Sequence, residues 1–229
     1  MPATQVVTLQ RASERASGFL ALPHDANCHS AIIVIHEWWG LNQWVKQQTW
    51  NLAASGYVAL AVDLYQGNVT ADPSEARKLK RRLRADHAIC TLRAAFDYLA
   101  RRPDVHPDHI GSLGWSMGGG LALELAIDES RLTACAVHYG PLPTSLAQIR
   151  KINAQALGLF GARDRGVPPQ NVRAFERSMK MLNKSVDIKI YDGVGHGFEN
   201  PANKAGYRAD IAADAWSRTL RFFGQREEP

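Results

Sequence analysis

The stretch Ile110-Gly-Ser-Leu-Gly-Trp-Ser116-Met-Gly-Gly-Gly-Leu-Ala-Leu-Glu124 decides how the rest of the chain is interpreted. It predicts a short apolar strand that ends at Trp115, a serine at position 116 and a helix that begins at once. Glycines two residues before and after the serine match the G-x-S-x-G pattern of a nucleophile elbow, where strand and helix approach closely. The helix start would direct free backbone N–H groups at an anion beside the serine. The alternative is a glycine-rich turn in which the serine is incidental.

The composition is that of an ordinary folded domain. The chain has 229 residues, 45% of them hydrophobic, with no repeat and no low-complexity tract. Its first residues lack the layout of a signal peptide, and the longest aliphatic run, residues 31–35, is too short to cross a bilayer. Cys28, Cys90 and Cys135 show neither a disulfide framework nor the spacing of zinc ligands. We therefore expect one domain over residues 1–229 in a cytoplasmic protein, with no membrane association, metal or cofactor.

The formal net charge of +5 is unevenly distributed. Six basic residues crowd one short segment: Arg77, Lys78, Lys80, Arg81, Arg82 and Arg84. No aromatic interleaving and no nucleic-acid-binding motif accompany them, so we expect no nucleic-acid partner. A solvated helix face explains such a run, and a more specific alternative is that one arginine holds a substrate carboxylate.

Strands and helices alternate along the chain. An N-terminal hairpin or extended lead-in is expected at residues 5–21, and a loop at 103–108. Strands are expected at residues 31–35, 57–62, 110–115, 133–137, 156–160 and 186–191, and helices at 43–54, 86–101, from 116 onward, around 172–182 and around 209–223. This order predicts an α/β fold with a mainly parallel, doubly wound sheet, helices on both faces and catalytic loops at the carboxyl ends of the strands.

A nucleophile elbow needs an acid and a histidine after later strands, in that order along the chain. Asp164 follows one expected strand, and His196 follows the next in a glycine-rich loop. A serine hydroxyl needs a base to take its proton, and a carboxylate must orient that base. Ser116, His196 and Asp164 are therefore the candidate triad. Asp192 is a rival acid, and His36 and His138 at other strand ends are rival bases.

Five segments together resemble the dienelactone hydrolases, a branch of the α/β-hydrolase fold. They are His36-Glu-Trp-Trp-Gly40, Asp63-Leu-Tyr65, Gly114-Trp-Ser-Met-Gly-Gly119, Phe160-Gly-Ala-Arg-Asp164 and Gly195-His-Gly-Phe198, and they span nearly the whole chain. The resemblance implies that Ser116, Asp164 and His196 form the triad and that the backbone N–H groups of Met117 and Trp38 form the oxyanion hole. It also implies that Glu37 contacts the resting nucleophile and helps its activation.

The chain departs from the family pattern in two places. The family usually has a cysteine where this chain has Ser116, so the serine is either a natural variant or a replacement that silences the enzyme. In dienelactone-specific members an arginine shortly after the histidine grips the substrate carboxylate, whereas this chain has Phe198-Glu-Asn200. A second family arginine matches the basic segment, where Arg77 or Arg81 would serve.

The sequence thus predicts a hydrolase that cleaves small carboxylic esters or lactones through an acyl-enzyme. Trp39 and Tyr65, with neighbouring tryptophans, suggest an apolar, aromatic substrate site, although such residues are as often core. One alternative is a catalytically silent or engineered cysteine-to-serine form. The other is a small-molecule-binding protein on the hydrolase scaffold. We expect a monomer or a small homo-oligomer.

Overall fold

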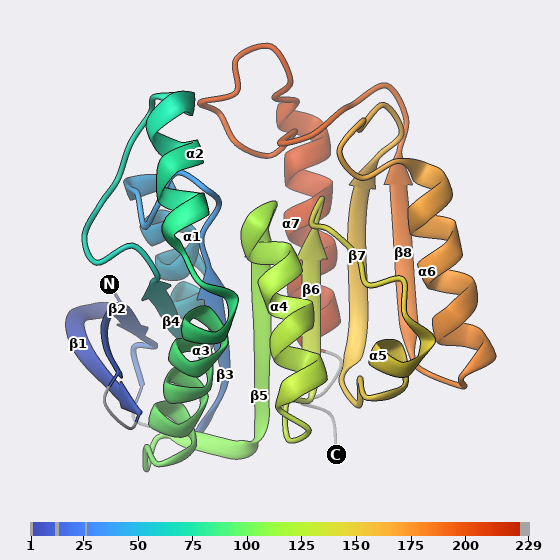
Figure 1. The fold of residues 1–229 in the computed structure, drawn as a ribbon. Helices are drawn as coiled ribbons and strands as arrows, with labels where there is room; N and C mark the ends of the chain where they lie inside the picture. Colours follow the sequence, from blue (N-terminus) through green and yellow to red (C-terminus); the bar gives the residue numbers. More distant parts are fainter. Residues whose placement is uncertain (1, 12–13, 26, 225–229) are drawn as a thin grey trace.

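One mainly parallel sheet organises the chain (Figure 1). The structure is a computed structural model that describes residues 2–11, 14–25 and 27–224. Its strands are β1 (Ala3–Arg11), β2 (Glu14–Leu22), β3 (His29–Ile35), β4 (Val58–Asp63), β5 (Val105–Trp115), β6 (Ala134–His138), β7 (Gln155–Gly161) and β8 (Val186–Tyr191). They lie in the order β1-β2-β4-β3-β5-β6-β7-β8, parallel from β4 to β8, with β1 and β2 antiparallel at one edge.

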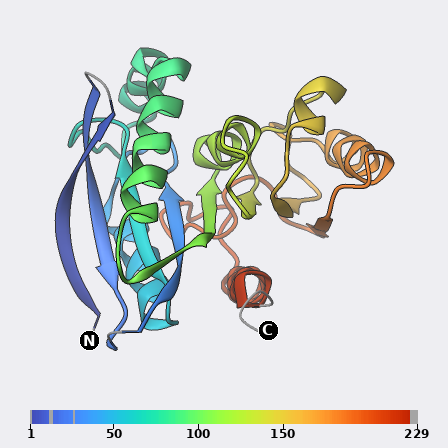
Figure 2. The same ribbon diagram turned by 90° about the horizontal axis from the view of Figure 1, so that it is seen from below.

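Helices cover both faces of this sheet, as Figure 2 shows end-on. One face carries α1 (Gln43–Ala54) and α7 (Ala209–Gly224), and the other carries α2 (Pro73–Arg82), α3 (Ala85–Ala100), α4 (Met117–Asp128), α5 (Leu146–Arg150) and α6 (Pro169–Met181). Side chains on a strand alternate between faces. Ile33 therefore packs into the core under α3 and α4, and its neighbour Ile32 into the core under α1 and α7. The prediction of a doubly wound α/β sheet is confirmed.

Two elements differ from the sequence prediction, while the N-terminal hairpin is confirmed as β1 and β2. Strand β5 begins at Val105, so the expected loop over 103–108 is partly wrong. Val105 pairs with His29 across a register shift, and the strand then continues through the exposed residues 106–108. Their polarity hid the strand from a search for apolar runs. The five-residue helix α5 was not expected, because it buries only Ile149.

The parallel strands bring the candidate segments together at one edge of the sheet. Strands β3, β5, β7 and β8 end at Ile35, Trp115, Gly161 and Tyr191, and each is followed by one of the segments singled out above. Carboxyl ends of parallel strands share an edge, so these segments meet in space although they are far apart in sequence. In the described part of the chain, no helix combines the length and apolar character needed to cross a membrane.

Candidate active site

Ser116 occupies the sharp turn between β5 and α4. Its backbone has φ 53° and ψ −117°, a left-handed conformation that is strained for a residue with a side chain. A Cβ on Gly114 would lie 2.1 Å from the Gly118 carbonyl oxygen, and one on Gly118 would lie 2.2 Å from that of Ile35. Both glycines are therefore required by the close approach of strand and helix. This is the local geometry of a nucleophile elbow.

The side chains of Ser116, His196 and Asp164 form a continuous hydrogen-bonded chain. Ser116 Oγ lies 2.7 Å from His196 Nε2, and His196 Nδ1 lies 2.8 Å from Asp164 Oδ2. Because Nδ1 faces a carboxylate, it carries the ring proton, and Nε2 is left to accept the proton of the serine hydroxyl. The geometry thus brings together the three residues that the sequence order selected.

Asp164 is held as an ionised acceptor. Its other oxygen, Oδ1, accepts the backbone N–H groups of Gly166 at 2.7 Å and Val167 at 3.0 Å. Burial raises the pKa of the Asp164 carboxyl, but the hydrogen bonds and charge of His196 and these two backbone donors outweigh it, leaving the pKa below its ordinary value. The rival Asp192 is exposed, and no hydrogen bond joins it to His196 among the residues described.

The two rival histidines have other partners. The His36 ring is buried, donates from Nδ1 to the Glu37 carbonyl oxygen at 2.6 Å and accepts the Leu64 N–H at 3.2 Å. Burial lowers the pKa of His36, so the ring stays neutral and joins the ends of β3 and β4. His138 is also fully buried and bonds to Glu199. Neither ring hydrogen-bonds to Ser116.

Glu37 is a buried carboxyl beside the triad. Asn200 Nδ2 donates to its Oε2 at 2.5 Å, and 3% of the residue is exposed. Burial raises the pKa of Glu37 from 4.5 to about 7, against the opposing hydrogen bond of Asn200 and the nearby charge of His196. The resemblance implied a contact between Glu37 and the resting nucleophile. In this structure the Ser116 hydroxyl instead hydrogen-bonds to His196.

The two backbone groups expected to form an oxyanion hole flank the elbow. Met117 is the first residue of α4, so its N–H precedes the intrahelical hydrogen bonds and lies at the positive end of the helix dipole. Trp38 lies in the turn that follows β3. The approach of Gly118 to the Ile35 and His36 carbonyl oxygens places the start of α4 against the end of β3. The oxyanion hole itself remains a prediction.

Several aromatic side chains lie on segments that follow the strands of the sheet near the elbow. Tyr65 is buried, and its hydroxyl donates to the Met117 sulfur at 3.3 Å; burial raises the pKa of Tyr65 to about 12. The rings of Trp38 and Trp39 meet edge to face with centroids 4.8 Å apart, and both residues are half-buried. Tyr139, which sequence reasoning missed, is fully buried with its ring 5.1 Å from that of His196.

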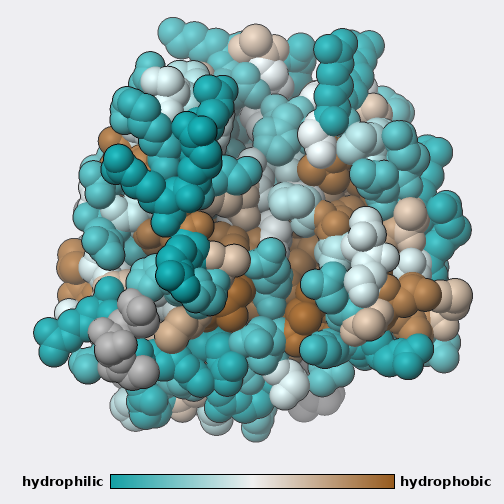
Figure 3. All heavy atoms as spheres, viewed as in Figure 1, coloured by the Kyte–Doolittle hydropathy of each residue, from teal (hydrophilic) through white to brown (hydrophobic). Residues whose placement is uncertain are grey.

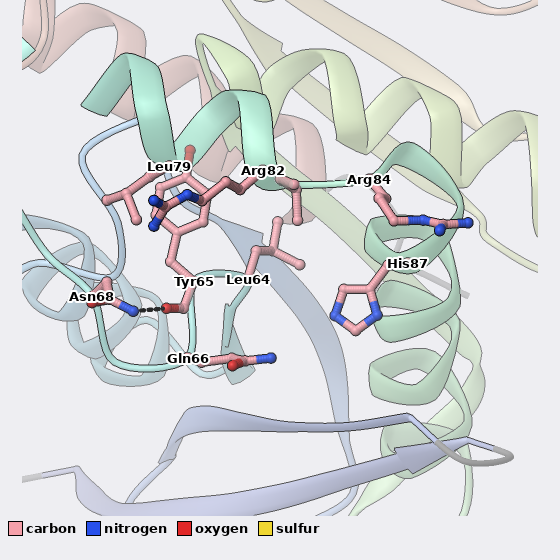
Figure 4. A pocket seen from close by; sticks show the side chains of 9 residues that line it. Leu64, Tyr65, Gln66, Asn68, Leu79, Arg82, Arg84 and His87 are labelled. Atoms are coloured by element: carbon pink, nitrogen blue, oxygen red, sulfur yellow. Dashed lines mark hydrogen bonds between the residues drawn. The ribbon is translucent and has the colours of Figure 1, made fainter. Parts of the chain in front are cut away.

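A cavity of about 320 Å³ opens between α2 and the loop that carries Tyr65 (Figure 4). Its lining combines apolar side chains with basic ones: Leu64, Tyr65, Gln66, Asn68, Leu79, Arg82, Leu83, Arg84 and His87. Arg77 and Arg81, which the sequence offered as substrate-binding residues, do not line this cavity, and their role stays a prediction. Both are exposed on α2, whereas Ala76 is buried and Leu79 is half-buried. The surface over this part of the molecule is largely hydrophilic (Figure 3). Arg82, which follows Arg81 on the same helix, does line the cavity.

No group of three or more metal-ligating side chains gathers anywhere in the described ranges. A serine after the central strand β5, an aspartate after β7 and a histidine after β8, on this mainly parallel sheet, match the arrangement of an α/β-hydrolase.

Within that class the chain belongs to the dienelactone hydrolase family, whose model matches residues 16–227. Protein usf of Aquifex pyrophilus is 30% identical over 230 residues, covering 96% of this chain and 97% of that protein. A probable 2-oxo-3-(5-oxofuran-2-ylidene)propanoate lactonase of a Bradyrhizobium species is 30% identical over 220 residues, covering 90% of this chain and 88% of that one.

The fold of the chain is also similar to that of proteins whose structures have been solved. A dienelactone hydrolase-like promiscuous phosphotriesterase from metagenomic libraries superposes with a TM-score of 0.89 at 22% identity, and the match covers 98% of each chain. The resemblance drawn from the five sequence segments is therefore confirmed, and the chain is a hydrolase of the dienelactone hydrolase type.

Proposed function

We propose that this protein hydrolyses small carboxylic esters or lactones through an acyl-enzyme on Ser116. The observation that carries the proposal is the unbroken chain from Ser116 Oγ through His196 to Asp164, with distances of 2.7 and 2.8 Å. Both lie within the range of a formed hydrogen bond, so the base needs no rearrangement before it accepts the serine proton. The proposal requires no metal or organic cofactor.

The reaction would proceed in two halves. His196 Nε2 removes the Ser116 proton as Oγ attacks the ester carbonyl, and the N–H groups of Met117 and Trp38 stabilise the resulting oxyanion. The imidazolium then protonates the departing alkoxide; in a lactone this oxygen stays attached to the acyl group. In the second half His196 activates a water molecule, which attacks the acyl-enzyme and releases the acid. Asp164 stabilises the imidazolium throughout without taking its proton.

Glu37 would act on this cycle through its charge. An ionised carboxylate near His196 stabilises the imidazolium and so makes the base easier to protonate. With a pKa of about 7, Glu37 is partly neutral at neutral pH, which limits this effect. Its Oε2 accepts from Asn200, whereas the Ser116 hydroxyl is bonded to His196. We assign Glu37 an electrostatic role rather than direct activation of the nucleophile.

The basic cavity beside Tyr65 favours substrates that carry an acidic group. Arg82 lines it and pairs with no carboxylate among the residues described, and the Tyr65 hydroxyl connects the cavity wall to Met117 at the elbow. Arginine binds carboxylates with a directed fork of N–H donors. We therefore propose that Arg82, rather than Arg77 or Arg81, binds the anionic group of the substrate. Trp39 and Tyr65 are proposed as apolar contacts of the substrate.

Ser116 in the position of the usual family cysteine supports a second candidate, a silent form that binds ligands without turning them over. Hydrolysis of p-nitrophenyl acetate by the protein and its Ser116→Cys and Ser116→Ala forms separates the two. We expect turnover by the serine form and a loss of at least about a thousandfold in the alanine form. Turnover by the cysteine form alone would establish the silent form. Equal rates in all three would remove Ser116 from the mechanism.

A further inference from the structure

A second buried histidine–carboxylate pair lies directly beside the triad and has no part in the mechanism above. His138, the last residue of β6, is fully buried, and its Nδ1 lies 2.8 and 2.9 Å from the two carboxylate oxygens of Glu199. Glu199 is 6% exposed and lies three residues after His196 on the same loop. Buried charged side chains are costly unless they are paired, so a pair at this place calls for a functional explanation.

The hydrogen bonds around His138 define how many protons the pair holds. Thr219 on α7 donates its only hydroxyl proton to the Ala215 carbonyl oxygen at 2.9 Å. Its oxygen, 3.0 Å from His138 Nε2, therefore accepts the ring proton on that nitrogen. A single further proton remains for the contact between Nδ1 and Glu199. Whichever partner holds it, the pair is neutral as a whole and its polar atoms are satisfied.

The pair connects the loop of the base to the strands of the nucleophile. Trp115, the residue before Ser116, donates its indole N–H to Glu199 Oε2 at 3.3 Å. The Ser116 backbone N–H donates to the His138 carbonyl oxygen at 2.9 Å. Glu199 is thus bonded to the last residue of β5, which precedes Ser116, and to the last residue of the neighbouring strand β6.

The other contacts that hold the His196 loop lie partly at the surface. The His196 side chain is 44% exposed, and the backbone around it is held by Asn203, which donates to the His196 and Gly197 carbonyl oxygens at the surface. The buried side chains after His196 are Phe198, Glu199 and Asn200. Of these, Asn200 bonds to Glu37 just after β3, and Glu199 bonds to the last residues of both β5 and β6. A displacement of about 1 Å at His196 is enough to break a hydrogen bond of this kind and slow catalysis severely.

We propose that the His138–Glu199 pair is a positioning device, which anchors the His196 loop to β5 and β6 and so holds the imidazole against Ser116 Oγ. The proposal rests on the proposed function for its kinetic consequences, but its structural consequence is independent of any substrate. Neither the His138 nor the Glu199 side chain hydrogen-bonds to the Ser116 hydroxyl. They act through the loop.

The decisive comparison is Glu199→Gln against Glu199→Ala. Glutamine keeps an oxygen that accepts from Trp115 and His138, whereas alanine removes both bonds. With p-nitrophenyl acetate we expect the glutamine form to keep kcat within about threefold of the parent protein and the alanine form to lose about tenfold to a hundredfold, each with little change in KM. The rate at which a fluorophosphonate modifies Ser116 should fall in parallel. Equal kcat in the two forms would overturn the proposal.

The double variant His138→Phe with Glu199→Leu tests whether a loss of kcat comes from lower stability of the protein or from a displaced His196. Replacing both partners of a buried pair with apolar residues commonly preserves or raises stability. Because the Trp115 indole N–H also loses its acceptor, we expect a melting temperature above that of Glu199→Ala, in which His138 is left unpaired as well, while kcat remains as low as in Glu199→Ala. A double variant with full kcat would refute the anchor. Thr49→Val, which removes a buried hydroxyl bonded to Val45 in α1, controls for general destabilisation and should leave kcat unchanged.

A measurement that needs no substrate tests the positioning role independently of the proposed function. The imidazole N–H that His196 shares with Asp164 gives a downfield proton NMR signal, which should persist in Glu199→Gln and be lost or broadened in Glu199→Ala. A parent protein that shows this signal yet hydrolyses no ester would contradict the proposed function while leaving the anchor to be judged on the signal. An unchanged signal in the alanine form would refute the anchor whatever the activity.

Discussion

Ser116 and Tyr139 are both held at positive φ, 53° and 41°, at the ends of the neighbouring strands β5 and β6. Left-handed backbone costs a non-glycine residue roughly 1–3 kcal/mol, so two such residues side by side mark a site rather than a chance turn. At Ser116 the turn projects the hydroxyl toward His196. At Tyr139 it places the aromatic ring against the same imidazole, with the centroids 5.1 Å apart. The base is thus contacted from both strand ends.

Glycines in the elbow are required because a side chain would clash with the backbone, whereas glycines in surface turns are required only by their backbone conformation. Gly118→Ala should prevent folding or destabilise the protein by more than about 4 kcal/mol, because its Cβ would lie 2.2 Å from the Ile35 carbonyl oxygen. Gly56 has φ +94° and no atom near the position of a Cβ. Gly56→Ala should therefore cost about 1 kcal/mol, from backbone strain alone. Urea unfolding of the two variants measures the contrast, and equal losses would contradict the steric argument.

The identity of the acid is tested by a pair of isosteric changes. Asp164→Asn keeps the shape but loses the charge that orients and stabilises the imidazolium, so kcat should fall by about three to four orders of magnitude. Asp192→Asn alters an exposed side chain on the histidine loop and should leave kcat within about twofold. Both are measured with p-nitrophenyl acetate. The reverse ranking would assign the acid to Asp192.

The raised pKa of Glu37 predicts in which direction the free energy of unfolding changes with pH. The folded protein keeps this carboxyl protonated up to a pKa of about 7, whereas the unfolded chain ionises it near 4.5. The folded state therefore binds more protons between these values, and the free energy of unfolding falls as the pH rises through the window, by up to about 3 kcal/mol. Glu37→Gln, which retains an acceptor for Asn200, should remove this decline. Urea unfolding at pH 4.5 and 7.5 compares the two proteins, and identical slopes would show that the pKa of Glu37 is not raised.

The orientation of α2 predicts which arginine matters for charged substrates. Arg82→Gln should raise KM about threefold to tenfold for an ester or lactone that carries a free carboxylate, since the site is open to solvent and the ion pair correspondingly weak. It should not change KM for p-nitrophenyl acetate. Arg77→Gln, a matched change on the outer side of the same helix, is expected to alter neither value. An effect of Arg77 equal to that of Arg82 would restore the original assignment.

The sequence was sufficient to predict the sheet and to select three residues that the structure joins by hydrogen bonds, because both follow from where the strands begin and end. Continuous runs of β-branched residues such as 31–35 mark buried parallel strands, and the order serine, acid, histidine follows from where those strands end. The carboxyl ends of parallel strands share an edge, so order along the chain was enough to select Ser116, Asp164 and His196. Strand β5 shows the limit of this approach, since Val105 pairs with His29 across a register shift and the exposed residues 106–108 interrupt its apolar pattern.

What only the tertiary structure decided is how side chains from different elements pair once they are buried. The sequence cannot indicate that Asn200 binds Glu37, that His138 binds Glu199, or that Arg82 rather than Arg77 faces the cavity. These partners lie up to 163 positions apart, and a helix of ten residues shows its inward face only when its packing is known. Sequence periodicity reports which residues are buried. The three-dimensional packing determines which buried polar groups pair with each other. Each polar group must find a partner there, because a group left without one in the interior destabilises the fold.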